Sequence, residues 1–341
     1  MRDREALLRA VAANHRAWFR RHGDVAERSR GIDLIVNGRE GTIAFPARRS
    51  RAAVAWAVDR ATALGLPTVS CWSLSEDKAL GTLLIARGFE WGWQPWWMAL
   101  DLDALPDEEL RHRVRSRRRG AIYVLAVRDE RHNIGGVVVN PWRGIAGIYD
   151  MGVRPEYRRR GIGRALTLAA GRLARDLGCT HAVLNATPEG ELLYRTVGFG
   201  RLGEGRTWWR HPGEHTTPRQ QELVEAIGFG DLARLEASEP TDAELERSIG
   251  GAGSPLVITV LTGQPAVAEW ILARRPDLVS ADLGEVGYTL LHAAAEWDAP
   301  EVAAVALARG ADATIRDGVH NGTPLRWAEH FGRERIAAML G

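Results

Sequence analysis

A basic, glycine-containing loop stands out in the stretch Val153–Leu166, VRPEYRRRGIGRAL, between a strand-like run and a helix. Gly161 and Gly163 let the backbone approach a ligand closely, because a Cβ there would block it. The amides of residues 159–164 would point outward at a helix N-terminus, where a phosphate or pyrophosphate is favoured. Four arginines add positive charge around the same spot: Arg158, Arg159, Arg160 and Arg164. The pattern indicates phosphate binding, and an ordinary Arg/Gly-rich turn is the alternative.

The spacing Arg158-x-x-Gly161-x-Gly163 is neither the dinucleotide fingerprint nor a Walker A loop. It resembles the acyl-CoA pyrophosphate loop, R/Q-x-x-G-x-G/A, of the GNAT superfamily of N-acyltransferases. A helix over 161–177, a strand over His181–Ala186 and a second helix opened by Thr187-Pro188 follow. The later Leu193-Tyr194-x-x-x-Gly198-Phe199 also reads as in GNAT enzymes. The resemblance implies a GNAT fold for residues 105–212.

The same resemblance implies roles for individual residues. Tyr194 matches the proton donor to the leaving thiolate, and the backbone amide of Val153, with Met151, matches the group that polarises the thioester carbonyl. Asp150 resembles the aspartate that faces the substrate amine in some aminoglycoside N-acetyltransferases, and is expected to be the base or to bind the amine. A strand-end cap or an ion pair is the alternative for Asp150. The expected acetyl-CoA contacts are Met151, Val153, Arg158, Arg159, Arg160, Gly161, Ile162, Gly163, Arg164 and Asn185.

Other reactive side chains nearby are expected to be structural or solvated. Glu189 and Glu191 are alternative bases, more typical of solvated carboxylates. His181 lies within a strand and is interpreted as a structural histidine. Cys179 is interpreted as packing, because direct attack by the amine needs no acyl-cysteine.

The elements that position these residues read as β-β-β-α-β-α-β. Strands are predicted over Ala121–Val127, Ile134–Val139 and Ile145–Val153. The crossover through the helix 161–177 puts the loop at the carboxyl end of the strand 145–153. The run Arg111–Arg119 is interpreted as a solvated helix face, with contact to nucleic acid or to the 3′-phosphate of CoA as the alternative.

The first part of the chain repeats the second half of this region. Leu64-Gly65, Gly88-Phe89 and Trp96-Trp97 match Leu177-Gly178, Gly198-Phe199 and Trp208-Trp209. The first copy has Phe45–Ser50 in place of the glycine loop and Leu84 in place of Tyr194. Residues 1–104 are therefore interpreted as a degenerate GNAT-like lobe that neither binds CoA nor catalyses. Strands over 33–36 and 42–45 around an Asn37-Gly38 turn are predicted between helices 4–20 and 50–64.

The tryptophans of the first lobe, Trp91, Trp93, Trp96 and Trp97, could stack on a substrate. The interpretation preferred here is that they pack into the interface between the lobes.

The last third changes character at about residue 213 and reads as helix–turn–helix. Thr289-Leu-Leu-His292 and Thr323-Pro-Leu-Arg326 repeat with a period of 323 − 289 = 34 and resemble the Thr-Pro-Leu-His signature of ankyrin repeats. Leu290 and Arg326 depart from that signature, and a first copy at Ser254 is barely recognisable. The threonines are expected to cap the helices. We expect this tail to pack on the lobes and to shape or cover the acceptor cleft.

Length, net charge and cysteine count limit the kinds of partner and site that the protein is expected to have. The chain has 341 residues, a formal net charge of +2 and two cysteines. Nucleic acid is therefore not an expected partner, and neither a disulfide framework nor a metal site is predicted. No apolar run is long enough to span a bilayer. A cytoplasmic setting without a membrane partner is expected.

The predicted fold class is α/β: tandem GNAT-like lobes, 1–104 degenerate and 105–212 catalytic, followed by an all-α ankyrin-like domain, 213–341. The predicted function is acetyl-CoA-dependent N-acetylation of a primary amine on a small metabolite or antibiotic. One alternative is acetylation of a peptide or protein partner recruited by the tail. The other is a non-catalytic acyl-CoA sensor.

Overall fold

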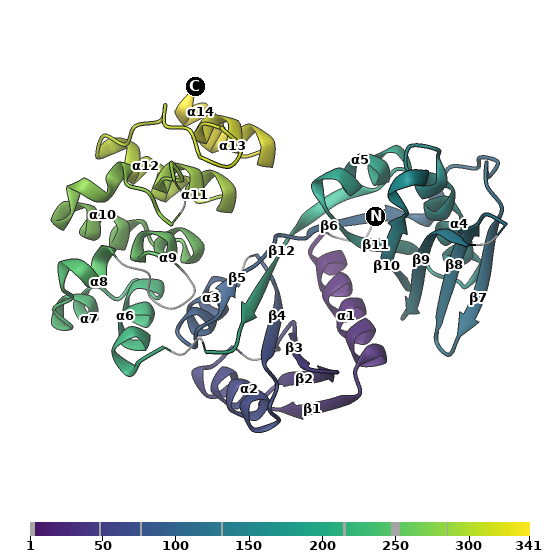
Figure 1. Cartoon of the computed structure of the whole chain (residues 1–341), viewed down its shortest axis with the longest axis horizontal. Helices are drawn as coiled ribbons and strands as arrows, with labels where there is room; N and C mark the ends of the chain where they lie inside the picture. Colours follow the sequence, from purple (N-terminus) through teal and green to yellow (C-terminus); the bar gives the residue numbers. More distant parts are fainter. Residues whose placement is uncertain are drawn as a thin grey trace.

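The computed structural model describes residues 4–47, 49–75, 77–130, 132–213, 216–246, 253–284 and 286–341. Within them, twelve strands form one continuous sheet through two lobes, and a helical tail lies beside the first lobe (Figure 1). The strand order is β1-β2-β3-β4-β12-β6-β11-β10-β9-β8-β7, with short β5 as an additional partner of β12.

The first lobe contains the predicted helices and strands. Gly38, with φ of 59°, completes the turn that joins β2 to β3. The Ser50 hydroxyl caps α2 by accepting from the amide of Ala53 at 3.3 Å. The elements are α1 (Arg4–His22), β1 (Val25–Ser29), β2 (Ile32–Asn37), β3 (Glu40–Ala44), α2 (Arg51–Ala63), β4 (Thr68–Leu74), α3 (Lys78–Ile85), β5 (Glu90–Trp91) and β6 (Trp96–Asp101).

The second lobe contains the predicted strand–helix alternation and one further strand, β7. Its elements are β7 (Val114–Arg119), β8 (Ile122–Arg128), β9 (Asn133–Trp142), β10 (Ile145–Val153), α4 (Ile162–Asp176), β11 (His181–Ala186), α5 (Pro188–Thr196) and β12 (Gly200–Arg210).

The interpretation of Arg111–Arg119 as a solvated helix face is wrong. Residues 114–119 form β7, an edge strand that pairs antiparallel with β8 after a turn at Gly120. Nearly all of its side chains are exposed, so no apolar stripe distinguishes a strand from a helix in the sequence. Charged residues are common on such edges because they discourage pairing with other chains.

The two lobes exchange their last strands. β6 follows the first lobe but pairs with β11 of the second, Trp97 opposite Asn185. β12 follows the second lobe, and its later half pairs with β4 of the first, Trp208 opposite Cys71. β6 and β12 also pair with each other. The two Trp-Trp motifs recognised in the sequence therefore lie on the exchanged strands, and the division at residues 104 and 105 separates segments that are interleaved in space.

Two helical layers cover the shared sheet. On β11, Ala182 and Leu184 face a core that includes α4, whereas Val183 faces a second core built on α1. Trp97, 1% exposed, belongs to the α1 core, so the interpretation as a packing residue is confirmed for it. Trp96 is 4% exposed, and its ring lies 6.5 Å from that of Phe331 in the tail. Trp93 is 40% exposed and is not part of either core.

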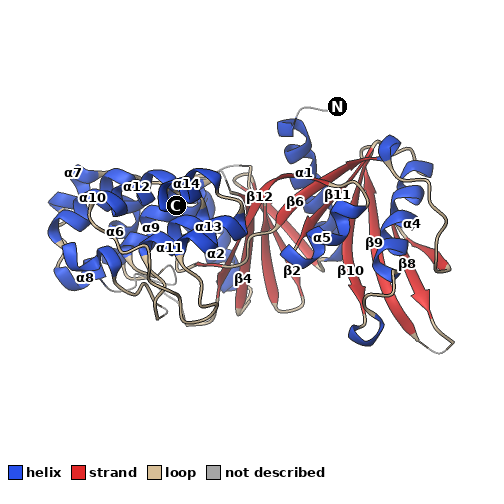
Figure 2. Ribbon diagram, turned by 90° about the horizontal axis from the view of Figure 1, so that it is seen from above, coloured by secondary structure: helices blue, strands red, loops and turns tan. Residues whose placement is uncertain are grey.

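The tail is helical and its helices stack in pairs, as Figure 2 shows. The threonine caps are confirmed: Thr323 Oγ1 accepts from the amide of Arg326, and Thr289 forms a capping box with His292. The likeness to ankyrin repeats itself stays a prediction. The elements are α6 (Pro218–Gly228), α7 (Leu232–Ala237), α8 (Asp242–Glu246), α9 (Pro255–Thr262), α10 (Pro265–Arg274), α11 (Leu290–Trp297), α12 (Pro300–Ala308), α13 (Pro324–Phe331) and α14 (Glu334–Leu340). The predicted helical region 217–249 is described as far as residue 246.

The tail packs against the first lobe through a single apolar core. Leu83 and Leu84 of α3 share this core with Leu223 and Ile227 of α6. The contact is close, because a Cβ on Gly228 would lie 2.5 Å from Thr82 Oγ1. The expectation that the tail packs on the lobes is therefore confirmed.

Candidate active site

The opening between β10 and β11 is the feature around which the candidate residues gather. The two strands pair in parallel only from Ile145 opposite His181 to Ile148 opposite Leu184. β10 continues to Val153 with β9 as its partner, and β11 ends at Ala186. The carboxyl ends of the two strands therefore separate, and no strand of the described residues pairs with β10 on that side beyond Ile148.

Asp150 forms a β-bulge at this opening. The pairing of β10 with β9 shifts by one residue between Tyr149 and Gly152, and Asp150 has φ of 49°. This left-handed conformation is costly for most residues and best tolerated by Asn, Asp and Gly. The Asp150 side chain is exposed and makes no hydrogen bond or ion pair to a described residue. The bulge thus presents an unpaired carboxylate where the strands part.

The N-terminus of α4 lies next to this opening in the chain. Its N-cap is Gly161, with φ of +80° and no side-chain cap. The first amides of the helix are therefore available to an anion. Gly161 and Gly163 differ in how much space a side chain would have. A Cβ on Gly161 would meet only His112 Nε2 at 4.0 Å, whereas a Cβ on Gly163 would lie 2.9 Å from Leu193 Cδ2. Gly163 thus serves helix packing as well as any ligand approach.

The arginines of the loop divide into two groups. Arg158 donates from Nε to the Val153 carbonyl at 3.2 Å, and Arg160 donates to the Glu156 carbonyl at 3.0 Å. Both are exposed, as is Arg159, which has φ of 62°. Arg164 differs because its guanidinium is held by the Glu108 carboxylate and by the Thr196 carbonyl at 2.7 Å. Arg164 therefore connects the loop to neighbouring segments.

The segment before β7 also reaches this region, although the sequence indicated contact to CoA only as an alternative for Arg111–Arg119 and did not single out Glu108 or His112. The Arg164 guanidinium lowers the pKa of Glu108, and His112 Nε2 contacts the Arg160 carbonyl at 2.8 Å. Glu108, Gly161 and Arg164 line a hollow of about 160 Å³ beside the α4 N-terminus. The acidic run before Arg111 was the available signal, but these partners lie 48 or more residues apart in sequence.

Tyr194 lies on α5, which Thr187 caps by accepting from the Gly190 amide at 3.1 Å. Burial raises the pKa of the Tyr194 phenol to about 12. The hydroxyl makes no hydrogen bond to a described residue, and the ring lies 5.7 Å from that of Phe199. A phenol in this environment stays protonated at neutral pH and can act as a donor.

The structure brings the predicted site residues to one region. Tyr194 shares a core with Ile148, Leu184 and Ile162, and half-buried Met151 and Val153 pack against that core. Asn185 follows Leu184, the last residue of β11 that pairs with β10, and is half-buried.

The side chains that were expected to be structural or solvated fall into a buried group and an exposed group. Cys179 and His181 are buried, and burial raises the pKa of the Cys179 thiol. Glu189 is exposed as expected. The expectation of a solvated Glu191 is wrong, because this carboxylate is 8% exposed and accepts from Arg195 Nε at 3.0 Å.

The corresponding place in the first lobe lacks these features. The α2 N-terminus is closed by Ser50, and the adjacent Arg51 pairs with Glu225 of the tail. Leu84 takes the place of Tyr194 and is fully buried. Within the described ranges there is no cluster of side chains that could hold a metal ion. No helix in the described parts of the chain has the length and apolar character that crossing a membrane requires.

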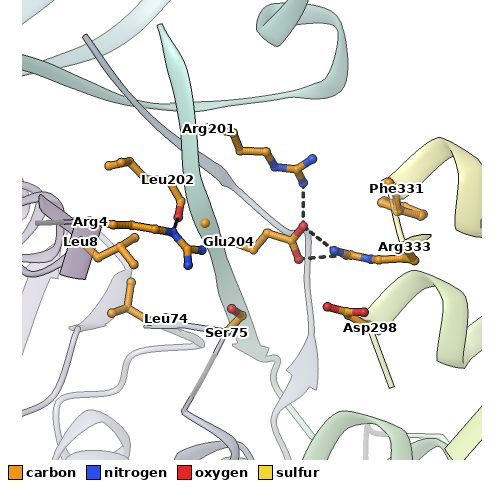
Figure 3. A pocket seen from close by; sticks show the side chains of 12 residues that line it. Arg4, Leu8, Leu74, Ser75, Arg201, Leu202, Glu204, Asp298, Phe331 and Arg333 are labelled. Carbon is orange, nitrogen blue, oxygen red and sulfur yellow. Dashed lines mark hydrogen bonds and ion pairs between the residues drawn. The ribbon is translucent and has the colours of Figure 1, made fainter. Parts of the chain in front are cut away.

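A second hollow, of about 510 Å³, lies where α1, β12 and the tail meet (Figure 3). Glu204 of β12 reaches across it to Arg333 of the tail, with oxygen–nitrogen distances of 2.8 and 2.9 Å. Arg201 donates to the same carboxylate at 2.6 Å. The tail therefore forms part of the wall of this hollow.

The fold of this chain is similar to the folds of solved acetyltransferase structures. A GCN5-related N-acetyltransferase from Kribbella flavida is 15% identical and covers 60% of this chain and 95% of its own, with a TM-score of 0.50. A second from Sphaerobacter thermophilus is 17% identical over 53% and 76% of the two chains, with a TM-score of 0.41. A tandem GNAT protein from the clavulanic acid biosynthesis pathway is 15% identical over 55% and 81%, also with a TM-score of 0.41. Curated protein sequences give no match.

A family match adds to the likeness of fold. Residues 80–199 match the acetyltransferase (GNAT) family. This range begins in α3 and contains β6, the open ends of β10 and β11, the α4 loop and Tyr194. The chain is therefore an acetyltransferase, and residues 80–199 are the part that matches the GNAT family.

Proposed function

We propose that this acetyltransferase transfers the acetyl group of acetyl-CoA to a primary amine of a small metabolite or antibiotic, by direct attack. The observation that carries the proposal is the separation of β10 from β11 after Ile148, at a bulge whose left-handed residue is Asp150. An uncapped helix N-terminus at Gly161 follows a few residues later.

Acetyl-CoA would bind along this opening. The amides at the start of α4 would hold the pyrophosphate, with Arg158, Arg159 and Arg160 at its rim. The exposed backbone of β10 near Met151 and Val153 would receive the thioester, and Asn185 on the facing strand would contact the pantetheine arm. The contrast with the first lobe supports one such site in each chain, because Ser50 closes the equivalent N-terminus.

The chemistry requires two proton movements. The amine nitrogen attacks the carbonyl carbon of the thioester and forms a tetrahedral intermediate. The C–S bond then breaks, and CoA leaves as the thiolate. Asp150 would accept the proton that the amine loses, and the Tyr194 hydroxyl would give a proton to the departing thiolate. Burial keeps the Tyr194 phenol protonated for this step.

The packing of the tail on the lobes favours a small-molecule acceptor over a protein acceptor recruited by the tail. Helices α6 and α9 of the tail bury apolar side chains against α3, so the faces of these helices that pack on α3 are not available to a partner. The Arg333–Glu204 contact also places the tail at the wall of a small hollow.

The test is release of free CoA with a panel of primary amines, with product detected by mass spectrometry. Asp150→Asn should lower kcat by about 100-fold or more. Asn keeps the left-handed backbone accessible, so this variant tests the carboxylate and not the bulge. Asp176→Asn, at the exposed end of α4, is the matched control. Absence of acetylated product from every amine would refute the proposal.

A further inference from the structure

The hollow at the junction of α1, β12 and the tail has the size of a small-molecule site. Its volume is about 510 Å³, within the range usual for ligand pockets. Its wall is formed by segments far apart in sequence: Arg4 on α1, Leu74 and Ser75 at the end of β4, Arg201–Glu204 on β12, and Asp298 with Arg333 on the tail (Figure 3). It is separate from the hollow beside the α4 loop.

Strand register connects this pocket to the opening between β10 and β11. Ala186, at the end of β11, lies opposite Trp96 of β6, and Trp96 lies opposite Glu204 of β12. Glu204 is thus level with the carboxyl end of β11 and two strands away, which is roughly 10 Å at the usual strand spacing. The opening lies beyond β11, so an amine can reach the thioester only in a molecule that extends well out of the pocket.

Part of the pocket charge is already neutralised within the protein. The Glu204 carboxylate, 14% exposed, accepts from Arg201 and from two nitrogens of Arg333. The Arg333 side chain is 8% exposed and also donates to the carbonyls of Ala295 and Glu296. These groups hold the wall together.

Other charged groups lining the pocket keep polar atoms that make no hydrogen bond or ion pair to a described residue. Arg4 uses only Nε, which donates to the Leu202 carbonyl, and its two terminal nitrogens remain open (Figure 3). Arg201 uses one nitrogen on Glu204 and stacks 4.0 Å above the Trp96 ring. Asp298 lines the opposite side with an unpaired carboxylate. Guanidinium groups outnumber carboxylates in this lining, which disfavours a polycation.

We propose that this pocket holds one end of the acetyl acceptor and that the acceptor is a small zwitterion, an amino acid or short peptide whose reacting group is a second amine at the other end of the molecule. The carboxylate is bound by Arg4 with help from Arg201, and Asp298 receives an ammonium or amide donor of the same molecule. The inference rests on the proposed function for the reacting amine. It narrows the acceptor class and argues against polycationic antibiotics.

The test compares binding of amino acids and dipeptides with binding of their methyl esters, by calorimetry on the full-length protein. The acid of at least one pair should bind tenfold or more tightly than its ester. Arg4→Gln should reduce that preference to about twofold, and should raise KM for the acid with little change in kcat. Arg9→Gln is the matched control, because Arg9 lies on the same helix, pairs with Glu5 alone among the described residues and does not line the pocket.

The second variant is Asp298→Asn. Asp298 has φ of 55°, which Asn also tolerates, so this change removes charge without straining the backbone. It should weaken binding of the free dipeptide more than binding of the form that is acetylated at its N-terminus, which lacks the α-ammonium group.

The outcomes distinguish a failure of the zwitterion inference from a failure of the proposed transfer reaction. Equal binding of acids and esters, unchanged preference in Arg4→Gln, tighter binding of an aminoglycoside, or no binding of any probe overturns the zwitterion inference. Carboxylate-selective binding that depends on Arg4, with no CoA released from any amine, supports the pocket and refutes the proposed transfer reaction.

Discussion

Arg333, close to the end of the chain, is bound in a two-pronged ion pair to Glu204 on the strand that both lobes share. The side chains are 8% and 14% exposed. The contact therefore fixes the tail to the central sheet beside the proposed acceptor pocket.

Breaking this pair should destabilise the protein measurably. Arg333→Met leaves a largely buried carboxylate with Arg201 alone, and should lower the free energy of unfolding by about 3 kcal/mol. Urea denaturation measures the loss. Arg326→Met removes an exposed pair with Glu329, at 75% and 51% exposure, and should cost less than about 1 kcal/mol. Similar losses in both variants would mean that the buried contact has no special weight.

Gly161→Asp should weaken acetyl-CoA binding at least tenfold, because it places a negative charge at the proposed pyrophosphate site. Gly178→Asp is a close control: it lies at the other end of α4, with φ of 77° against 80° for Gly161, and a Cβ there meets no atom within 4 Å. Both variants bear similar backbone strain, so a difference in affinity by calorimetry reports the ligand. Equal affinities would remove the support for the loop.

Tyr194→Phe should lower kcat by about 10–1000-fold with little change in KM for acetyl-CoA, if the hydroxyl protonates the thiolate. Steady-state kinetics with a saturating amine measures both constants. Because burial raises the Tyr194 pKa to about 12, deprotonation of this phenol should not limit wild-type activity below about pH 11. Wild-type turnover in the variant would transfer the role to another group.

His15 should make the protein sensitive to acid. Its ring is buried among aromatic rings, 4.7 Å from both Phe19 and Trp72, and burial lowers its pKa to about 3. The unfolded chain takes up this proton below about pH 6.5 and the folded chain does not, so stability falls as the pH drops from 6.5 toward 3. Between pH 7 and pH 5 the loss should be about 2 kcal/mol. His15→Phe should flatten this slope in urea titrations, and an unchanged slope would contradict the assignment.

Truncation after Gly213 should expose the apolar face of α3 and cause aggregation, because Leu83 and Leu84 lose the helices that cover them. Light scattering of the purified fragment tests this. A monodisperse fragment with the wild-type melting temperature and acceptor KM would make the tail an independent module.

Local patterns predicted the elements whose residues interact with near neighbours. The Arg158–Gly163 loop, the stripe of α4 and the threonine caps depend on contacts within a few positions, so the sequence displays them directly. Strand β7 was missed because its exposed side chains give no alternation.

Long-range partners could not be predicted in this way. The clamp on Arg164 comes from Glu108, 56 positions away, and the burial of Glu191 depends on how α5 packs. The repeated Trp-Trp motif marked two equivalent strands, but their local sequence does not specify which lobe receives each one.

The strand exchange has a consequence for synthesis. β4, Thr68–Leu74, lies inside the finished sheet, but its neighbour on one side is β12, which is complete only when Arg210 has been made. At about 5–20 residues per second, the nascent first lobe waits roughly ten seconds with that edge open. An unpaired edge strand is a site of misassociation. Translation speed between β4 and β12, and any chaperone that shields the edge on the ribosome, should therefore govern how much of this enzyme reaches its native form.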